Sequence, residues 1–185
     1  MLDRIDLLVL DVDGVLTDGR IVYDSRGADV KFYHVIDGQG VKYWTRVGHE
    51  AAILSGKSSR TIRRRAKEIG IRVVYEDVKD KLPVFRKILK RMGRTADRVC
   101  YIGDDLVDLP VMAEVGFAVA TPAAAAEVKR LAHYVTQQPG GAGAVRETIE
   151  LILSYQGLWE EVRRRYRDRT EVAIPAIRRP WREDQ

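Results

Sequence analysis

Residues 7–19 read LLVLDVDGVLTDG, in which a short apolar run ends in two carboxylates one residue apart. Four consecutive aliphatic residues bounded by polar ones are typical of a strand buried on both faces of a parallel sheet. Asp11 and Asp13 follow this strand on the same side of its end, because side chains alternate along an extended chain. Two charges placed at the tip of a buried strand indicate a functional site there rather than a plain turn.

Similar apolar runs alternate with helical patterns along most of the chain. The predicted strands are Ile5–Leu10, Ala51–Leu54, Val73–Tyr75, Arg98–Ile102 and Phe117–Ala120. The predicted helices are Gly40–Val47, Ser59–Ile69, Leu82–Met92, Leu106–Val115, Ala124–Leu131 and Ala144–Tyr155. Strands and helices that alternate with short connections predict an α/β fold, a doubly wound Rossmann-like parallel sheet covered on both faces.

Two segments depart from this alternation. Ile21–Tyr23 and Val30–Tyr33 flank the turn sequence DSRG, which predicts a β-hairpin flap after the first strand. The rest of the chain from there to the second strand has room for only one helix. We expect one domain at 1–157 and a basic C-terminal tail at 158–185, in which Leu158–Arg169 can form a short helix.

Composition narrows the class of protein. The 185 residues carry a net charge of +5, and no apolar stretch approaches the length of about 20 residues that spans a bilayer. Cys100 is the one cysteine, so no internal disulfide can form. The basic stretch at 57–72 has no interleaved aromatic residues, which disfavours a nucleic-acid partner. We expect a cytoplasmic protein with no membrane partner.

Ligands of doubly wound folds bind at the carboxyl ends of the strands, where the strand order reverses. The polar residues that follow the predicted strands are Asp11, Asp13, Ser55, Gly56, Lys57, Lys81, Asp104, Asp105 and Asp108. Converging carboxylates repel one another unless a cation lies between them, and carboxylate and carbonyl oxygens suit Mg²⁺. A serine hydroxyl and a lysine ammonium can hold a phosphoryl group. The set predicts a site for phosphoryl transfer in which Asp11 can be the nucleophile.

Four short motifs now point to a family. DVDGVLTDG at 11–19, ILSG at 53–56, DK at 80–81 and GDDLVD at 103–108 resemble, in that order, the motifs of the haloacid dehalogenase-like phosphatase superfamily. VIDGQG at 35–40, YIGDDLVDLPVM at 101–112, AHYVT at 132–136 and GGAGAVRE at 140–147 are similar to its capless group, which includes the 3-deoxy-D-manno-octulosonate (KDO) 8-phosphate phosphatases. The resemblance covers roughly 7–157. Members of the superfamily that have a cap domain insert it after the first motif or between the second and third. The hairpin and one helix fill the first interval, and only 26 positions (81 − 55) separate Ser55 from Lys81, so we expect no cap domain.

The resemblance implies roles for the carboxylates. Asp11 would attack phosphorus and form an aspartyl-phosphate, and Asp13 would protonate the leaving alkoxide and then activate water. Mg²⁺ would be bound by Asp11, the main-chain carbonyl of Asp13 and Asp104. Asp105 and Asp108 would be outer partners of the metal or of Lys81.

The resemblance also implies a substrate and an assembly. Ser55 and Lys81 would hold the phosphoryl oxygens, beside Gly56 and Lys57. The substrate would be a sugar-acid phosphate, KDO 8-phosphate of lipopolysaccharide precursor synthesis. Ile36 and Lys57 stand where the resembling group has arginines, so a related nonulosonate 9-phosphate stays open. A homotetramer would use neighbouring hairpins and tails to close the site.

Some alternatives remain at this stage. A receiver-like module or a noncatalytic binding module could also carry acids, serine and lysine at this edge. Receivers place the adjacent acidic pair on the first strand, whereas here Asp104 and Asp105 come late, and no member of the site is missing. Gly140–Gly143 could be a flexible lead into the last helix or a loop facing the substrate, and Arg146 a solvated charge or part of the site.

Overall fold

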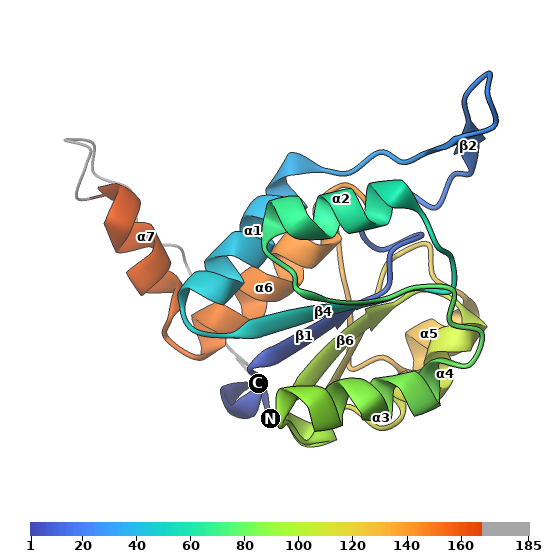
Figure 1. Cartoon of the computed structure of the whole chain (residues 1–185). Helices are drawn as coiled ribbons and strands as arrows, with labels where there is room; N and C mark the ends of the chain where they lie inside the picture. Colours follow the sequence, from blue (N-terminus) through green and yellow to red (C-terminus); the bar gives the residue numbers. More distant parts are fainter. Residues whose placement is uncertain (168–185) are drawn as a thin grey trace.

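The computed structural model describes residues 1–167. Its central feature is a parallel sheet of six strands in the order β5-β4-β1-β6-β7-β8. The strands are β1 (Leu7–Leu10), β4 (Glu50–Leu54), β5 (Val73–Tyr75), β6 (Val99–Gly103), β7 (Phe117–Ala120) and β8 (Tyr134–Val135). β1 pairs in parallel with both β4 and β6, so the strand order reverses at β1 (Figure 1). The predicted doubly wound sheet is confirmed, and Asp11 follows its central strand.

Helices cover both faces of this sheet. The α-helices are α1 (Val35–Arg46), α2 (Arg60–Ile69), α3 (Lys81–Met92), α4 (Leu109–Met112), α5 (Ala126–Leu131), α6 (Ala144–Tyr155) and α7 (Trp159–Arg167). Short 3₁₀ turns occur at η1 (Leu2–Arg4), η2 (Ala96–Arg98) and η3 (Leu106–Asp108). None of the helices within 1–167 is both long enough and apolar enough to cross a bilayer.

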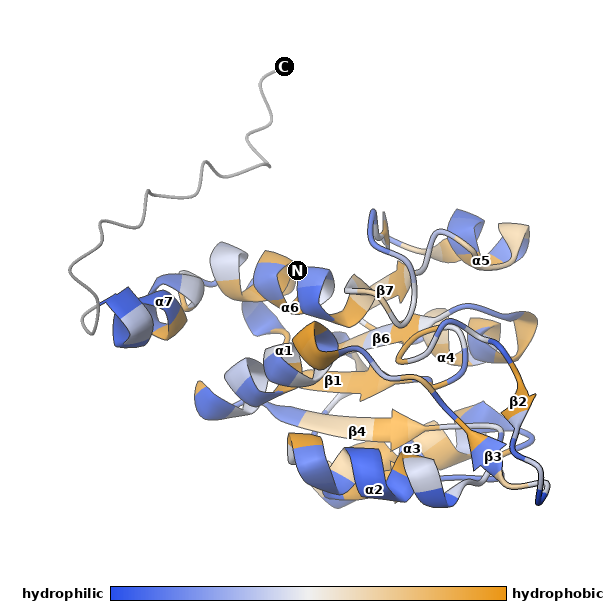
Figure 2. Ribbon diagram, turned by 90° about the horizontal axis from the view of Figure 1, so that it is seen from above, coloured by the Kyte–Doolittle hydropathy of each residue, from blue (hydrophilic) through white to orange (hydrophobic). Residues whose placement is uncertain are grey.

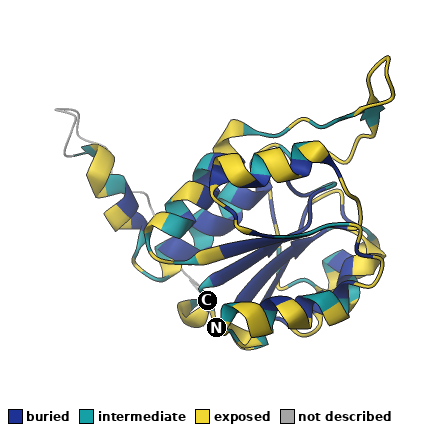
Figure 3. Ribbon diagram, viewed as in Figure 1, coloured by how far each residue is buried: buried dark blue, intermediate teal, exposed yellow. Residues whose placement is uncertain are grey.

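The core has two halves, one on each face of the sheet. Leu8 and Leu10 of β1 pack on the face that carries α1, α2 and α6, whereas Leu7 and Val9 pack on the face that carries α3, α4 and α5. Every residue of β1 is therefore buried, as its uninterrupted apolar run predicted. The central strands β1, β4 and β6 are mostly orange, that is apolar, in Figure 2 and mostly dark blue, that is buried, in Figure 3.

Some elements differ from the sequence-based expectations. The first helix begins at Val35 rather than at Gly40, and the His34 side chain caps it by accepting the Ile36 N–H. A Cβ on Gly40 would lie 3.1 Å from the Arg146 side chain, so this glycine allows α1 and α6 to pack closely. The helix expected over 106–115 is split into η3 and the short α4. β8 was not predicted, since a strand of two residues carries no periodicity to detect.

The hairpin and α7 are the two additions to this sheet. β2 (Val22–Tyr23) and β3 (Asp29–Val30) form a separate antiparallel pair that projects from the domain (Figure 1). α7 packs back through Trp159 and Val162, which are buried against the α1–α6 side of the core. Gly157, where the predicted tail begins, has φ +75° in the turn between α6 and α7. Residues 168–185 of that tail lie outside the described part.

Candidate active site

The loop that follows β1 contacts the loop that follows β6. The main-chain N–H of Asp11 still donates to the Ile102 carbonyl at 3.1 Å, which fixes Asp11 between β1 and β6. The chain then turns at Gly14, which has φ +85°. A Cβ on Gly14 would lie only 1.9 Å from a carboxylate oxygen of Asp104, so a glycine is needed for the two loops to meet.

Lys81 joins two of the buried acids. Its ammonium lies 3.1 Å from Oδ1 of Asp11 and 2.6 Å from Oδ1 of Asp108. Burial alone would lower the pKa of Lys81, but the charges of Asp11 and Asp108 outweigh it and raise this pKa above its ordinary value. Lys81 is therefore a cation at neutral pH, placed at the first residue of α3 beside the nucleophile predicted from the sequence.

Asp108 organises the loop after β6. Its Oδ1 accepts a hydrogen bond from the Tyr101 hydroxyl at 2.6 Å as well as the contact from Lys81. Its Oδ2 accepts the main-chain N–H groups of Asp104 and Asp105 at 3.0 and 3.1 Å. Both oxygens of Asp108 are thus engaged in holding protein groups. Asp105 is exposed and caps η3 by accepting from the Leu106 N–H.

The acidic cluster has the chemistry of a divalent-metal site. Asp11, Asp104 and Asp108 each offer a carboxylate oxygen, and these oxygens lie within 4.8 Å of one another. Burial, opposed by Lys81, raises the pKa of Asp11 to about 6, and burial together with the Asp11 charge raises the pKa of Asp104 to about 7. Hard oxygen donors that repel each other fit Mg²⁺, with Asp11 and Asp104 as the carboxylates that are not saturated by backbone groups.

These raised pKa values couple folding to pH. Protons bind Asp11 and Asp104 more tightly in the folded chain than in the unfolded chain, whose carboxyl pKa is 3.8. Without a cation, their contribution to stability is fully present below that value and is lost as the pH rises through about 6 to 7. A divalent ion bound between Asp11 and Asp104 stabilises their charged forms, so at neutral pH their repulsion no longer lowers the free energy of unfolding.

Asp13 is held by a residue that the sequence analysis missed. The Lys31 ammonium lies 2.5 Å from Oδ1 of Asp13, and the Lys31 side chain is only 4% exposed. The Asp13 carboxylate is not part of the acidic cluster, which leaves its main-chain carbonyl as the group for the predicted metal contact. Lys31 follows β3, between Val30 and Phe32, and strand alternation in VKF was the one local signal that it points away from its apolar neighbours.

Ser55 lies at the end of β4 in a fixed position. Its main-chain N–H donates to the Tyr75 carbonyl at 2.9 Å, and its carbonyl accepts from Val78 at 3.1 Å. The Ser55 Oγ accepts the Lys57 N–H at 3.2 Å, which leaves the hydroxyl proton able to donate to a ligand. Gly56 and Lys57 are exposed at the rim.

The glycine-rich loop at residues 140–143 packs against the loop that follows β1. A Cβ on Gly140 would lie 1.9 Å from the Gly14 carbonyl oxygen, and the Gly141 N–H donates to Val15 at 2.9 Å. The buried Asp37 of VIDGQG accepts the N–H groups of Gly143 and Arg146 at 3.1 and 2.9 Å. Residues 140–143 therefore hold the loop that follows β1 in place. The residues at the strand ends give no sign of this contact.

The Arg146 side chain points away from the acids. Its guanidinium lies over the rings of Tyr43 and Trp159, at 4.7 and 5.1 Å, and pairs with Glu150. Arg146 thus joins α6 to α1 and α7 and is not part of the candidate site.

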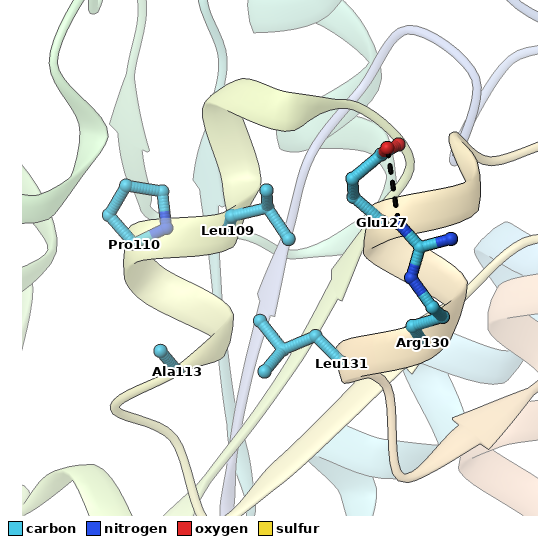
Figure 4. A pocket seen from close by; sticks show the side chains of 6 residues that line it. All are labelled: Leu109, Pro110, Ala113, Glu127, Arg130 and Leu131. Atoms are coloured by element: carbon cyan, nitrogen blue, oxygen red, sulfur yellow. Dashed lines mark hydrogen bonds and ion pairs between the residues drawn. The ribbon is translucent and has the colours of Figure 1, made fainter.

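The surface of residues 1–167 includes the following two hollows. One lies at the base of the hairpin, against α2, and is lined by Lys31, Phe32, Tyr33, Thr61, Arg64, Arg65 and Glu68. The other is an apolar groove between α4 and α5 that is lined by Leu109, Pro110, Ala113 and Leu131, and Arg130 pairs with Glu127 on α5 (Figure 4). The apolar groove contains none of the predicted site residues.

Comparison with known proteins agrees with this geometry. A sequence profile of haloacid dehalogenase-like hydrolases matches residues 28–116, a span that includes Ser55, Lys81 and Asp104. The 3-deoxy-D-manno-octulosonate 8-phosphate phosphatase of Yersinia pestis is 41% identical over 153 residues, 83% of this chain and 82% of that protein. The chain belongs to this phosphatase family.

Solved structures of the family match the fold as well. The KDO 8-phosphate phosphatase of Moraxella catarrhalis, in complex with magnesium, phosphate and KDO, superposes with a TM-score of 0.87 at 38% identity, over 89% of this chain and 95% of that one. The cobalt-bound enzyme of Haemophilus influenzae gives 0.82 at 40% identity, over 84% and 91%. The resemblance inferred from the motifs is confirmed.

Proposed function

We propose that this chain is a Mg²⁺-dependent phosphoric monoester hydrolase that converts KDO 8-phosphate into KDO and phosphate, for lipopolysaccharide precursor synthesis. The observation that carries the proposal is the buried Asp11, held by Lys81 beside Asp104, in a member of this phosphatase family. A soluble sugar phosphate and a lone buried thiol, Cys100, support a location in the cytoplasm.

In the first half-reaction an Asp11 oxygen attacks phosphorus opposite the ester oxygen. The P–O bond to the sugar breaks, the sugar oxygen takes a proton from Asp13, and an aspartyl-phosphate forms on Asp11. Lys81 and the Ser55 hydroxyl donate to the phosphoryl oxygens, where negative charge develops. Gly56 and Lys57 line the exposed side on which the sugar lies.

In the second half-reaction Asp13 takes a proton from a water molecule as that water attacks phosphorus. The bond to Asp11 breaks, phosphate departs and Asp11 is free again. Asp11, Asp104 and the Asp13 main-chain carbonyl would hold Mg²⁺, which supplies charge neutralisation for the phosphoryl oxygens when it is bound. Asp108 keeps Lys81 and the Asp104 main chain in place, and Asp105 caps η3, the turn that ends at Asp108.

A substrate panel with and without metal tests this function. We expect KDO 8-phosphate to give a kcat/KM at least about 10²-fold above glucose 6-phosphate, because a carboxylate-bearing sugar gains contacts that a neutral sugar lacks. A nonulosonate 9-phosphate tests the alternative left open by Ile36 and Lys57. Activity should vanish in EDTA and return with Mg²⁺. Full activity in EDTA would contradict the metal site.

We further propose a homotetramer in which hairpins of neighbouring subunits wall the active site. Ile21, Tyr23 and Phe32 on the hairpin are 59%, 65% and 56% exposed, and no cap covers the site within 1–167. A two-stranded hairpin is marginal in water alone, so packing against a neighbour both covers these side chains and stabilises the flap.

Charging the hairpin should therefore break the assembly. We expect Ile21→Asp with Phe32→Asp to give smaller particles in light scattering and a fall of kcat/KM of about 10-fold or more on KDO 8-phosphate. These positions are chosen because Val22 pairs with Val30 within the hairpin. Leu131→Asp, in the apolar groove of Figure 4, is the matched control. Dissociation by Leu131→Asp alone would place the interface at α4–α5 instead.

A further inference from the structure

Lys31 reaches from the base of the hairpin into the loop that follows β1. Its ammonium contacts Asp13 at 2.5 Å and also lies 3.7 Å from Oδ2 of Asp29 on β3. The side chain of Lys31 is 4% exposed, compared with 25% for Asp13. An ion pair of this burial differs from the surface pairs of the chain, which water screens and which add little to stability.

The pair fixes one oxygen of Asp13. Lys31 holds Oδ1, so Oδ2 is the oxygen left to meet a substrate. The Asp13 carboxylate lies against Lys31 and outside the cluster of Asp11, Asp104 and Asp108. Because a misplacement of about 1 Å can lower a rate by about 10², a group that carries a proton needs such a fixed position.

We infer that Lys31 is a positioning residue for Asp13, and that through it the placement of the hairpin controls proton transfer to the leaving sugar oxygen. The inference rests on the proposed function, in which Asp13 is the proton donor. Lys31 acts through Asp13 and does not itself contact the phosphoryl group. The inference is based on the contact of the buried Lys31 ammonium, at the base of the hairpin, with Asp13, two residues after the nucleophile Asp11.

Two substrates with different leaving groups separate a positioning role of Lys31 from a purely structural one, because a structural defect would lower kcat/KM equally for both. A sugar alkoxide needs a proton as it departs, whereas p-nitrophenolate leaves well without one. We expect Lys31→Met to lower kcat/KM for KDO 8-phosphate by about 10²-fold and for p-nitrophenyl phosphate by less than about 3-fold. Lys31→Arg, which keeps the charge, should recover most of the loss. Lys42→Met, an exposed lysine of α1, is the matched control.

A double-mutant cycle separates Lys31 from direct substrate contact. If Lys31 acts through Asp13, adding Lys31→Met to Asp13→Asn should change kcat/KM for KDO 8-phosphate by less than about 2-fold. A further large loss in that background would overturn the inference, as would equal losses on both substrates. Lys31→Gln repeats the cycle if Lys31→Met lowers the Tm.

Failure of the inference can be told apart from failure of the proposed function. An Asp11→Asn variant that still turns over would contradict the proposed function itself. So would an Asp13→Asn variant whose loss of kcat/KM is no larger on KDO 8-phosphate than on p-nitrophenyl phosphate. If both variants behave as proposed while Lys31→Met has parent activity on KDO 8-phosphate, only the positioning role is wrong.

Discussion

Asp11→Asn is expected to abolish turnover, with a loss of kcat of at least about 10⁴-fold. An amide oxygen is a poor nucleophile and cannot form the acyl-phosphate, whereas Ser55 and Lys81 would still bind phosphate and Asp104 would still bind Mg²⁺. The fold should survive, because Asn removes a charge that burial disfavours, as the raised pKa of Asp11 indicates.

Three measurements check this expectation. Steady-state kinetics gives the loss, thermal unfolding gives the stability, and mass spectrometry of acid-quenched enzyme finds a phosphoryl group in the parent but not in Asp11→Asn. Asp97→Asn, which changes an exposed acid in η2, is the matched control and should keep parent activity. Hydrolysis of KDO 8-phosphate by Asp11→Asn at even a tenth of the parent rate would exclude Asp11 as the nucleophile.

Lys81→Met should damage both activity and stability. It removes a donor to the phosphoryl group, for which we expect a fall of about 10³-fold in kcat. It also leaves Asp11 and Asp108 buried without their common cation, which costs on the order of 3–5 kcal/mol and lowers the Tm by about 10 °C.

A second substitution separates these two effects. Asp108→Asn added to Lys81→Met removes one of the stranded charges, so the double variant should regain at least about half of the lost Tm and none of the activity. Lys79→Met, exposed just before α3, is the matched control. Parent stability of Lys81→Met would contradict the buried contacts of Lys81, and parent activity would contradict its role with phosphate.

Local patterns were enough to predict what the strand ends carry. The apolar run of β1 defined a strand buried on both faces, and the topology of a doubly wound sheet then brought Asp11, Ser55 and Asp104 to one edge. The residue pattern thus led to the edge of the sheet, and the family resemblance added the roles.

Contacts made across the fold were not predictable in this way. Tyr101 looks like any interior strand residue, although its hydroxyl holds Asp108. Lys31 belongs to a hairpin whose placement no local pattern fixes, and Asp37 reaches the backbone of residues 143–146 from the start of α1. Each of these depends on where an element lies in space, which periodicity does not encode.

The close contact of Gly140 with Gly14 affects the point during synthesis at which the enzyme can become active. The ribosome synthesises β1 and its aspartates first, but β1 acquires its neighbours only with β4 and β6, and its loop acquires its backing only with residues 140–146. A nascent chain that has not yet exposed this last segment holds its aspartates in an unsupported turn. We therefore expect hydrolysis to begin only after nearly the whole domain has emerged, and incomplete translation products to contain Asp11 but to hydrolyse no phosphate ester.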